Sequence, residues 1–369
     1  MTAPGKENNM QTPTLLWDIG AAYDMFISLN VLHAPDRFGL RGAWAAGVRS
    51  RLPNAERDAL QRIIPAMNTP LHWLYALPSP KDGATVLQAM TAVPPADRLQ
   101  TIAKVPYMPP QTFEILENVA ARGGWLAADL AQLQAVYQEY WGEKLSTREA
   151  KERATCALEM WSRPLAFGEG LLAGLQAYQE VFFAEEELRI RPALEAALAR
   201  AQHLAGQMPL PSLIEELSRG VRLTQEFDMQ ELVLAPSFWG DPLMIFSNIG
   251  PGRDIVVFGG RPSDSSLVPG AVVPDALFQT LKALADPTRL RILRYLSEEP
   301  LTPAELARRL RLRAPTVVHH LHTLRLARLV QLTVEPEGKR YQARHEAVDE
   351  ACAMLHIYLD KGATGKKRS

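Results

Sequence analysis

The sequence predicts a mainly α-helical protein with a small antiparallel β segment and a separate C-terminal α+β module. Three observations predict this fold class. Apolar residues recur at three- and four-residue spacing through the first 220 positions, short apolar runs follow at about 230–260, and helical spacing returns after a stretch rich in Gly, Pro and Ser. At 369 residues the chain is also too long for one ordinary core, which favours several domains.

Residues 1–220 are expected to form a multi-helix domain. Stretches such as TFEILENVAARGGWLAADLAQLQAVYQEYWG have the helical period, and Pro and Gly cluster where helices should end. The spacing predicts a bundle of eight or more helices. Two interpretations of its aromatic residues stay open, a ligand pocket and an ordinary core; the residues are Trp17, Trp44, Trp73, Trp125, Trp141, Trp161 and Tyr137.

Residues 221–260 change period. The runs ELVLAPS, PLMIFSN and RDIVVFGG are short and apolar, and the turn sequences FWGDP and IGPGRD separate them. They predict a small antiparallel sheet segment. The Gly, Pro and Ser content of residues 261–274 is typical of a linker, so we place a domain boundary there.

The C-terminal module, residues 275–360, has consistent signals for the starts of helices. A helix is expected over 275–284. Asp286 is a helix N-cap followed by Pro287 at the first helical position. Thr302 and Glu305 form a capping box that opens the next helix, PAELARRLRL.

The stretch RAPTVVHHLHTLRLARLV, residues 313–330, predicts a helix with two different faces. Val317, Leu321 and Leu324 fall on one apolar stripe, whereas His319 lies on the opposite face with Thr316 and Thr323. The sequence LVQLTVEPEGKRYQAR then alternates around a turn and predicts a β-hairpin. Two short helices, a polar second helix and a basic hairpin form a winged helix-turn-helix, whose second helix would enter the major groove.

The segment from LKALADPTRLRIL to EGKRYQAR resembles the DNA-binding domain of the ArsR-type family of bacterial transcriptional regulators. The motifs LADPTRLRIL, TPAELA, TVVHHLHTL and EGKRYQ carry the resemblance, over about residues 275–360. It implies a homodimer that releases operator DNA on a signal, in the minority with a long N-terminal domain of unassigned role. The sequence departs from the family at Arg313 and Val318, where the family has Ser, and at Arg328, where it has Gly.

We therefore predict double-stranded DNA as the partner. From Leu277 onward the chain carries 17 Lys and Arg against 10 Asp and Glu, whereas the remainder carries 23 against 31. A basic C-terminal part on an acidic N-terminal part favours a polyanion as the binding partner, although a helical surface exposed to solvent would have the same charge. The predicted DNA-binding residues are Arg308, Arg311, Arg313, Thr316, His319, His320, Thr323, Lys339, Arg340 and Tyr341.

A two-fold dimer is predicted because one winged helix reads too few base pairs to find a genomic site. The last helix, 346–360, is the predicted dimer surface because its apolar stripe is too large for one small module to bury. Its apolar stripe is Ala347, Ala351, Met354, Leu355 and Tyr358. Asp349, Cys352 and His356 on the same helix are candidate metal ligands, but this spacing also suits an interface helix. We predict no metal and no cofactor, and a basic disordered tail at 361–369.

The sequence lacks GxSxG, HExxH, a P-loop and a Rossmann glycine run, so we predict that the protein is not an enzyme. The alternative is a winged helix used for protein interaction and attached to an unrecognised helical enzyme domain. The N-terminal domain is expected to sense a ligand other than a metal ion, or to be purely structural. Two cysteines and no signal peptide or membrane span favour the cytoplasm.

Overall fold

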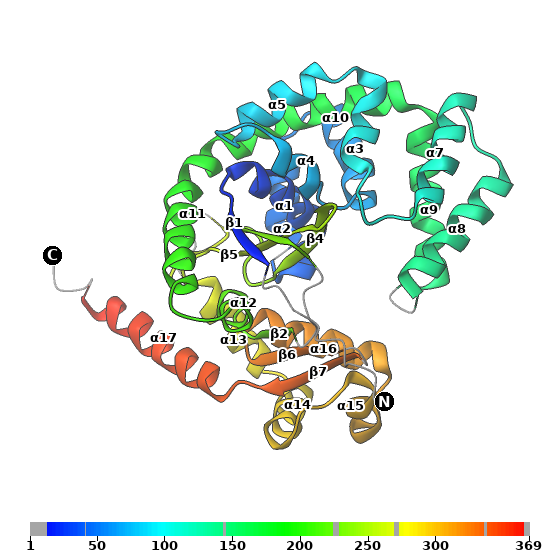
Figure 1. Cartoon of the computed structure of the whole chain (residues 1–369). Helices are drawn as coiled ribbons and strands as arrows, with labels where there is room; N and C mark the ends of the chain where they lie inside the picture. The colour runs from blue at the N-terminus through cyan, green and yellow to red at the C-terminus, as the bar shows by residue number, and fades with distance from the viewer. Residues whose placement is uncertain are drawn as a thin grey trace, which may run out of the picture.

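The computed structural model describes residues 13–40, 42–142, 145–223, 229–268, 273–335 and 338–364. The helices and strands within residues 13–268, here called the body, include a four-stranded sheet surrounded by helices. A winged helix, within residues 275–343, lies below the body, and the last helix projects away from both (Figure 1). The mainly α-helical fold with a C-terminal winged helix is confirmed. No helix within the described ranges is long and apolar enough to cross a membrane.

Helices make up most of the body. A π-helical turn, Gln179–Phe183, joins two of them into an arc that follows one side of the sheet (Figure 1). A 3₁₀ turn, η1 (Pro35–Phe38), follows the first helix. The helices are α1 (Ala21–His33), α2 (Gly42–Arg49), α3 (Asn54–Ile63), α4 (Leu71–Ala76), α5 (Gly83–Ala92), α6 (Arg98–Ala103), α7 (Pro110–Arg122), α8 (Ala127–Trp141), α9 (Thr147–Ser162), α10 (Pro164–Tyr178), α11 (Ala184–Ala205) and α12 (Leu210–Ser218).

The sheet of the body is mixed, not antiparallel as predicted. Its strands are β1 (Thr14–Trp17), β3 (Glu231–Ser237), β4 (Ile245–Gly250) and β5 (Arg253–Gly259), in the order β1-β3-β5-β4. The turn after β4 makes the expected antiparallel hairpin with β5. The connection through FWGDP instead carries the chain past β5 to β4, so that β3 and β5 run parallel. β1, from the start of the chain, also pairs in parallel with β3.

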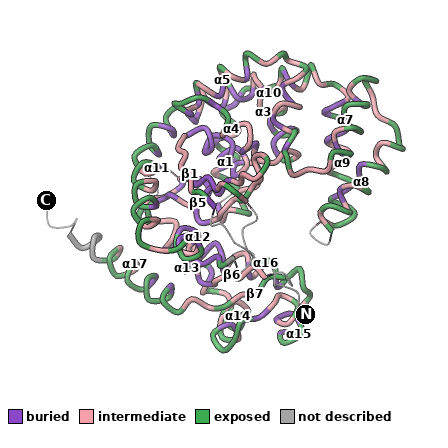
Figure 2. Tube along the Cα trace, in the orientation of Figure 1, coloured by how far each residue is buried: buried purple, intermediate pink, exposed green. Residues whose placement is uncertain are grey.

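Burial on both faces explains the parallel strands. Val233 and Val257 point into the core around α1, and Leu232 and Val256 point into a second core with α11 and α12. Continuous apolar runs are typical of parallel strands covered by helices on both sides, because no face of such a strand meets water. Figure 2 shows the buried residues gathered around α1 and the sheet. The central α1 is buried almost all round.

The winged helix contains α13 (Asp275–Leu284), α14 (Pro287–Glu298), α15 (Pro303–Leu310), α16 (Ala314–Leu326), β6 (Val330–Glu335) and β7 (Gly338–Ala343), and the last helix, α17 (His345–Thr364), follows it. Both predicted caps form: Asp286 accepts from the amide of Arg289, and Thr302 with Glu305 makes the capping box. The predicted wing tip includes residues 336 and 337, which lie outside the described residues.

The body and the winged helix share a sheet. Strand β2 (Val221–Leu223), which follows α12 of the body, pairs in parallel with β6, and β7 completes the order β2-β6-β7. The described part of the predicted linker before residue 269 packs at two places, because Arg261 and Leu267 are both buried. Helix α17 extends to Thr364, into the expected tail, and residues 365–369 lie outside the described part of the chain.

Candidate nucleic-acid interface

The turn between α15 and α16 presents two arginines to solvent. Arg311 caps α15 in the left-handed conformation, with φ of 54°, and the amide of Leu312 donates to the carbonyl of Ala307 at 3.0 Å. Leu312 packs on the core of the winged helix, whereas Arg311 and Arg313 are exposed. Arg308 on α15 is also exposed, so three predicted phosphate contacts surround the start of α16.

Helix α16 has the two faces that its sequence predicts. Val317, Leu321 and Leu324 are buried in the core of the winged helix. On the opposite side Thr316 and His319 are exposed. Thr323 is partly buried, and its hydroxyl donates to the carbonyl of His319 at 3.2 Å. The structure therefore brings Thr316, His319 and the start of α16 to one open surface.

His320 points toward the start of α14. Its ring is partly buried, and its Nδ1 is buried without a hydrogen-bond partner. Burial lowers the pKa of His320, although the nearby Asp286 carboxylate opposes the shift. A partly buried ring beside an N-cap is less available to a base than His319. His320 remains a predicted contact at the edge of the surface.

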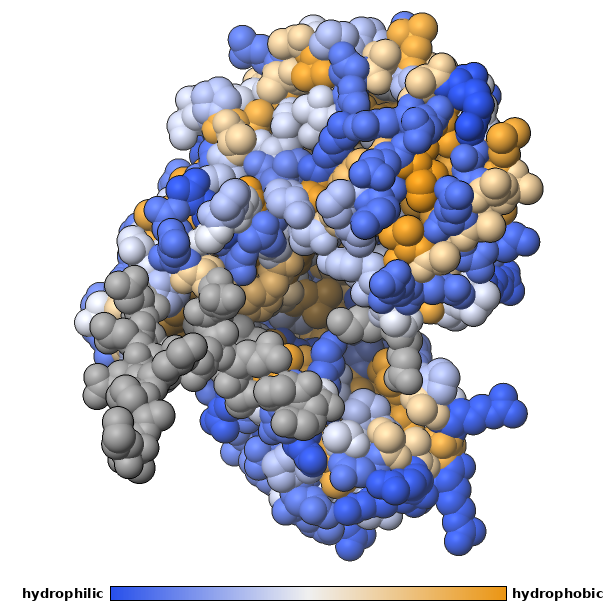
Figure 3. Space-filling view, turned by 45° about the vertical axis from the view of Figure 1, so that its right-hand side comes forward, coloured by the Kyte–Doolittle hydropathy of each residue, from blue (hydrophilic) through white to orange (hydrophobic). Residues whose placement is uncertain are grey.

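His322 contacts the body. Its ring N–H donates to the backbone carbonyl of Arg37 in η1 at 2.9 Å. No local pattern indicates this contact, because the two residues are 285 positions apart. The molecule is hollowed between the body and the winged helix, with long hydrophilic side chains projecting from the latter (Figure 3).

The wing presents one exposed cation and one paired cation. Lys339 is exposed. The Arg340 guanidinium lies 3.2 Å from Glu335 and 3.6 Å from Glu305, so DNA must compete with two carboxylates for it. Tyr341 packs partly buried against the core, and its backbone pairs with Leu301. The place of Tyr341 favours a structural role over the predicted DNA contact.

The end of α16 is anchored in the body by two arginines. Arg325 is buried, and its guanidinium donates to the backbone carbonyls of Ser218 and Arg219, each at 3.4 Å. Burial lowers the pKa of Arg325 to about 10. Arg328 has a φ of 60° and forms an ion pair with Asp241 of the body. A Gly at this position would suit the backbone conformation, but it has no guanidinium to make the pair.

Asp241 is the centre of a charged cluster at this junction. Its carboxylate is buried and lies 3.3 Å from Arg261 and 4.0 Å from Arg219, in addition to its ion pair with Arg328. Burial raises the pKa of Asp241, and the guanidinium groups of Arg261 and Arg219 oppose that rise. Sequence reasoning missed this cluster, because its members come from four distant segments.

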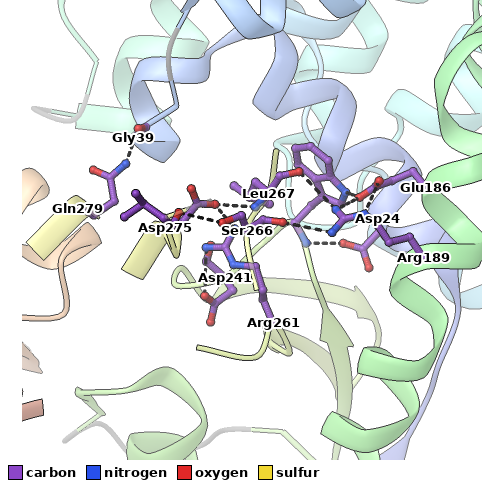
Figure 4. A network of polar contacts seen from close by, with 12 residues as sticks. Asp24, Gly39, Glu186, Arg189, Asp241, Arg261, Ser266, Leu267, Asp275 and Gln279 are labelled. Carbon is purple, nitrogen blue, oxygen red and sulfur yellow. Dashed lines mark hydrogen bonds and ion pairs between the residues drawn. The ribbon is translucent and has the colours of Figure 1, made fainter. Parts of the chain in front are cut away.

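Polar contacts continue from this cluster into the body (Figure 4). Asp275 of α13 accepts from the amide of Leu267 and lies 3.6 Å from Arg261. Arg189 of α11 donates to the carbonyl of Ser266 at 3.1 Å and forms an ion pair with the buried Glu186. The winged helix is thus bonded to the core of the body.

The candidate metal ligands of the last helix lie on its exposed surface. Asp349, Cys352 and His356 are all exposed on α17. Among the described residues, no group of three His, Cys, Asp or Glu side chains is arranged to hold a metal ion.

The aromatic residues of the body divide between core and surface. Trp44 stacks on Trp239 with ring centroids 5.8 Å apart, and Trp161 and Tyr137 are buried in the same core. Trp17, Trp73 and Trp125 pack partly buried against the cores. Trp141 also packs partly buried against the main core, and it lines an open groove of about 520 Å³ beside β4 with Tyr107, Tyr140, Phe246, Asn68, Asn248 and Asp254.

Comparison with known proteins gives one match. Residues 284–333 match the model of a helix-turn-helix domain family, which covers α14, α15, α16 and the start of β6. No curated protein and no solved structure matches the chain. The match supports a winged helix-turn-helix at the C-terminus and, in general, a DNA-binding regulator.

Proposed function

We propose that the protein is a cytoplasmic transcriptional regulator of the ArsR-like winged-helix type, which binds an operator as a homodimer. One observation carries the proposal. The first half of α16 presents Thr316 and His319 to solvent, and the exposed Arg308, Arg311 and Arg313 surround it. Hydroxyl and imidazole groups bond base edges, and guanidinium groups bond phosphates, so this surface has both parts of a DNA-reading site.

The proposal is tested by selecting fragments that the full-length protein binds from the genomic DNA of its own organism. A regulator enriches a small set of sequences with a common motif, and its affinity for them falls steeply with salt because phosphate contacts release counterions. A winged helix used for protein interaction would enrich no motif. The same experiment therefore separates the proposed function from its main rival.

Helix α17 supports the homodimer. Ala347 and Ala351 are buried at its start. The other residues of the predicted stripe, Met354, Leu355 and Tyr358, are partly buried. Ile357 and Leu359, which lie outside that stripe, are 54% and 59% exposed, and the helix projects from the rest of the molecule (Figure 1). Exposed large aliphatic side chains on a projecting helix favour burial against a second copy.

A two-fold dimer would place two recognition helices in successive major grooves, about 10 base pairs apart, on an imperfect palindrome. Sedimentation of the wild type and of an Ile357→Glu variant tests this. We expect a dimer for the wild type and a shift toward monomer for the variant, which places a charge in the interface. A monomeric wild type that protects a single half-site from cleavage would contradict the homodimer.

The groove beside β4 is the proposed place for a small-molecule signal. Tyr107, Tyr140 and Trp141 line it together with the polar Asn248 and Asp254, whose side chains are hydrogen-bonded to each other. This combination is typical of ligand sites, which hold an apolar body and orient it with a few polar groups.

The test of sensing uses the full chain, because the winged helix shares a sheet with β2 and buries Arg325 against the body. Operator affinity is measured with and without a metabolite extract, for the wild type and for Trp141→Ala. A response of the wild type that the variant lacks supports the groove. Equal responses would place the signal elsewhere, and no response in either would remove the sensing role.

A further inference from the structure

Residues Pro35–Gly39 form a corner of the body, here called the η1 corner, that lies against the second half of α16. Two hydrogen bonds hold it there: the ring N–H of His322 donates to the carbonyl of Arg37 at 2.9 Å, and the side-chain amide of Gln279 donates to the carbonyl of Gly39. Phe38 faces the same small cavity as Leu326 of α16. Arg37, Phe38 and Gly39 thus all lie against the winged helix and fix the position of the corner beside it.

The corner lies at one edge of the face that reads DNA. Because a helix turns by about 100° per residue, His322 lies about 60° around α16 from His319 and one turn farther along. A helix of about 10–12 Å diameter fills a major groove about 12 Å wide. A segment bonded to the edge of such a helix therefore lies over one of the two phosphate walls of the groove.

The η1 corner carries a cation, Arg37, beside this edge of α16. Arg37 is exposed, and within the described residues no hydrogen bond or ion pair engages its guanidinium. Two carboxylates lie nearby. Asp36 is exposed beside it, and Arg37 contributes, after the Ser146 hydrogen bonds and Arg153, to lowering the pKa of Glu149 at the start of α9. Among the described residues no ion pair joins Arg37 to Glu149, so its guanidinium is free to bond a phosphate directly.

We infer that the η1 corner is part of the DNA-binding surface and that Arg37 contacts a phosphate flanking the base pairs read by α16. The inference rests on the proposed DNA-binding function and assigns part of that function to the body. A phosphate contact carries no sequence information, so Arg37 adds to the affinity for every duplex alike.

The test measures the affinity of full-length protein for its selected fragment and for random duplex over a series of salt concentrations. Arg37→Gln removes the charge and keeps most of the side chain, and Arg37→Lys keeps the charge. The matched control is Arg62→Gln, because Arg62 is also exposed and lies on α3, away from the winged helix (Figure 1). Thermal unfolding of each variant checks that the fold is kept.

We expect Arg37→Gln to weaken both duplexes by the same factor, roughly three- to tenfold at low salt, and to make the salt slope shallower by about one unit. Arg37→Lys and Arg62→Gln should bind within about twofold of the wild type. Unchanged binding by Arg37→Gln would overturn the inference, and tighter binding would show that the corner shields α16. If the wild type itself does not bind duplex DNA, the proposed function fails instead.

Discussion

The two halves of α16 differ in what surrounds them. The first half, from Ala314 to His319, is open to solvent on its polar side. The second half is held by the body, through His322 on η1 and the buried Arg325 on the end of α12. One helix thus has a free half, to which we assign the reading of DNA, and an anchored half, whose contacts make the orientation of that surface depend on the body.

Replacement of Asp241 should give the largest effect, because it removes the anionic centre that holds the end of α16. Asp241→Asn keeps the shape of the side chain but leaves Arg219, Arg261 and Arg328 without this counter-charge. A lost partner in a buried cluster costs about 3–5 kcal/mol, and urea unfolding measures it. The control is the exposed Asp36→Asn, which should change stability by less than about 0.5 kcal/mol. A loss below about 1 kcal/mol at Asp241 would mean that the cluster does not anchor the helix.

The next effect compares the two halves directly. His319→Ala should weaken the selected fragment by about 1–3 kcal/mol and random duplex by less, because a base contact discriminates between sequences. His322→Ala should leave the ratio of the two affinities nearly unchanged, because that ring bonds a carbonyl of the body. Titration of labelled duplexes gives the affinity of each variant for the selected fragment and for random duplex. Equal losses on both duplexes with His319→Ala would reduce that residue to a phosphate contact.

A pair of substitutions at Arg328 separates backbone strain from ion pairing. Both Arg328→Gly and Arg328→Ala lose the pair with Asp241 and should unfold at lower urea than the wild type. The Ala variant should be less stable than the Gly variant by about 1 kcal/mol, because a residue with a Cβ is strained at a φ of 60°. If the Gly variant were as stable as the wild type, the stabilisation from the ion pair would only equal the cost of the backbone strain at Arg328.

The smallest effect concerns His320 and pH. Burial lowers the pKa of His320, so between its folded pKa and about 6.5 the unfolded chain binds more protons than the folded chain. This contribution to stability is therefore present above pH 6.5 and is lost as the pH falls. Chemical unfolding at pH 7.5 and 5.5 should show a smaller pH dependence for His320→Gln than for the wild type. The same pH dependence in both would place the ring in solvent.

Local signals made the winged helix predictable. The caps at Asp286 and Thr302 act over three residues, and the apolar stripe of α16 repeats over two turns, so neither depends on distant parts of the chain. The exposed Thr316 and His319 follow from the same stripe, because the polar face of an amphipathic helix is the face left in water.

The sheet and the anchored half of α16 depend on distant residues. β1 pairs with β3 more than 200 positions later, and nothing in either sequence records that pairing. The ion pair of Arg328 with Asp241 and the hydrogen bond of His322 to Arg37 also join residues far apart in the sequence. A polar side chain whose partner lies far along the chain has no periodicity to reveal it, so the sequence predicted the reading surface without the body that holds it.

The most direct test of the central claim is the dissociation constant of the full-length protein for its selected fragment and for random duplex, measured over a range of salt concentrations. We expect the fragment to bind at least about 10³-fold tighter than random duplex, and both affinities to fall steeply as salt rises. Equal affinity for the two duplexes, or binding that salt leaves unchanged, would contradict the reading of DNA by the free half of α16.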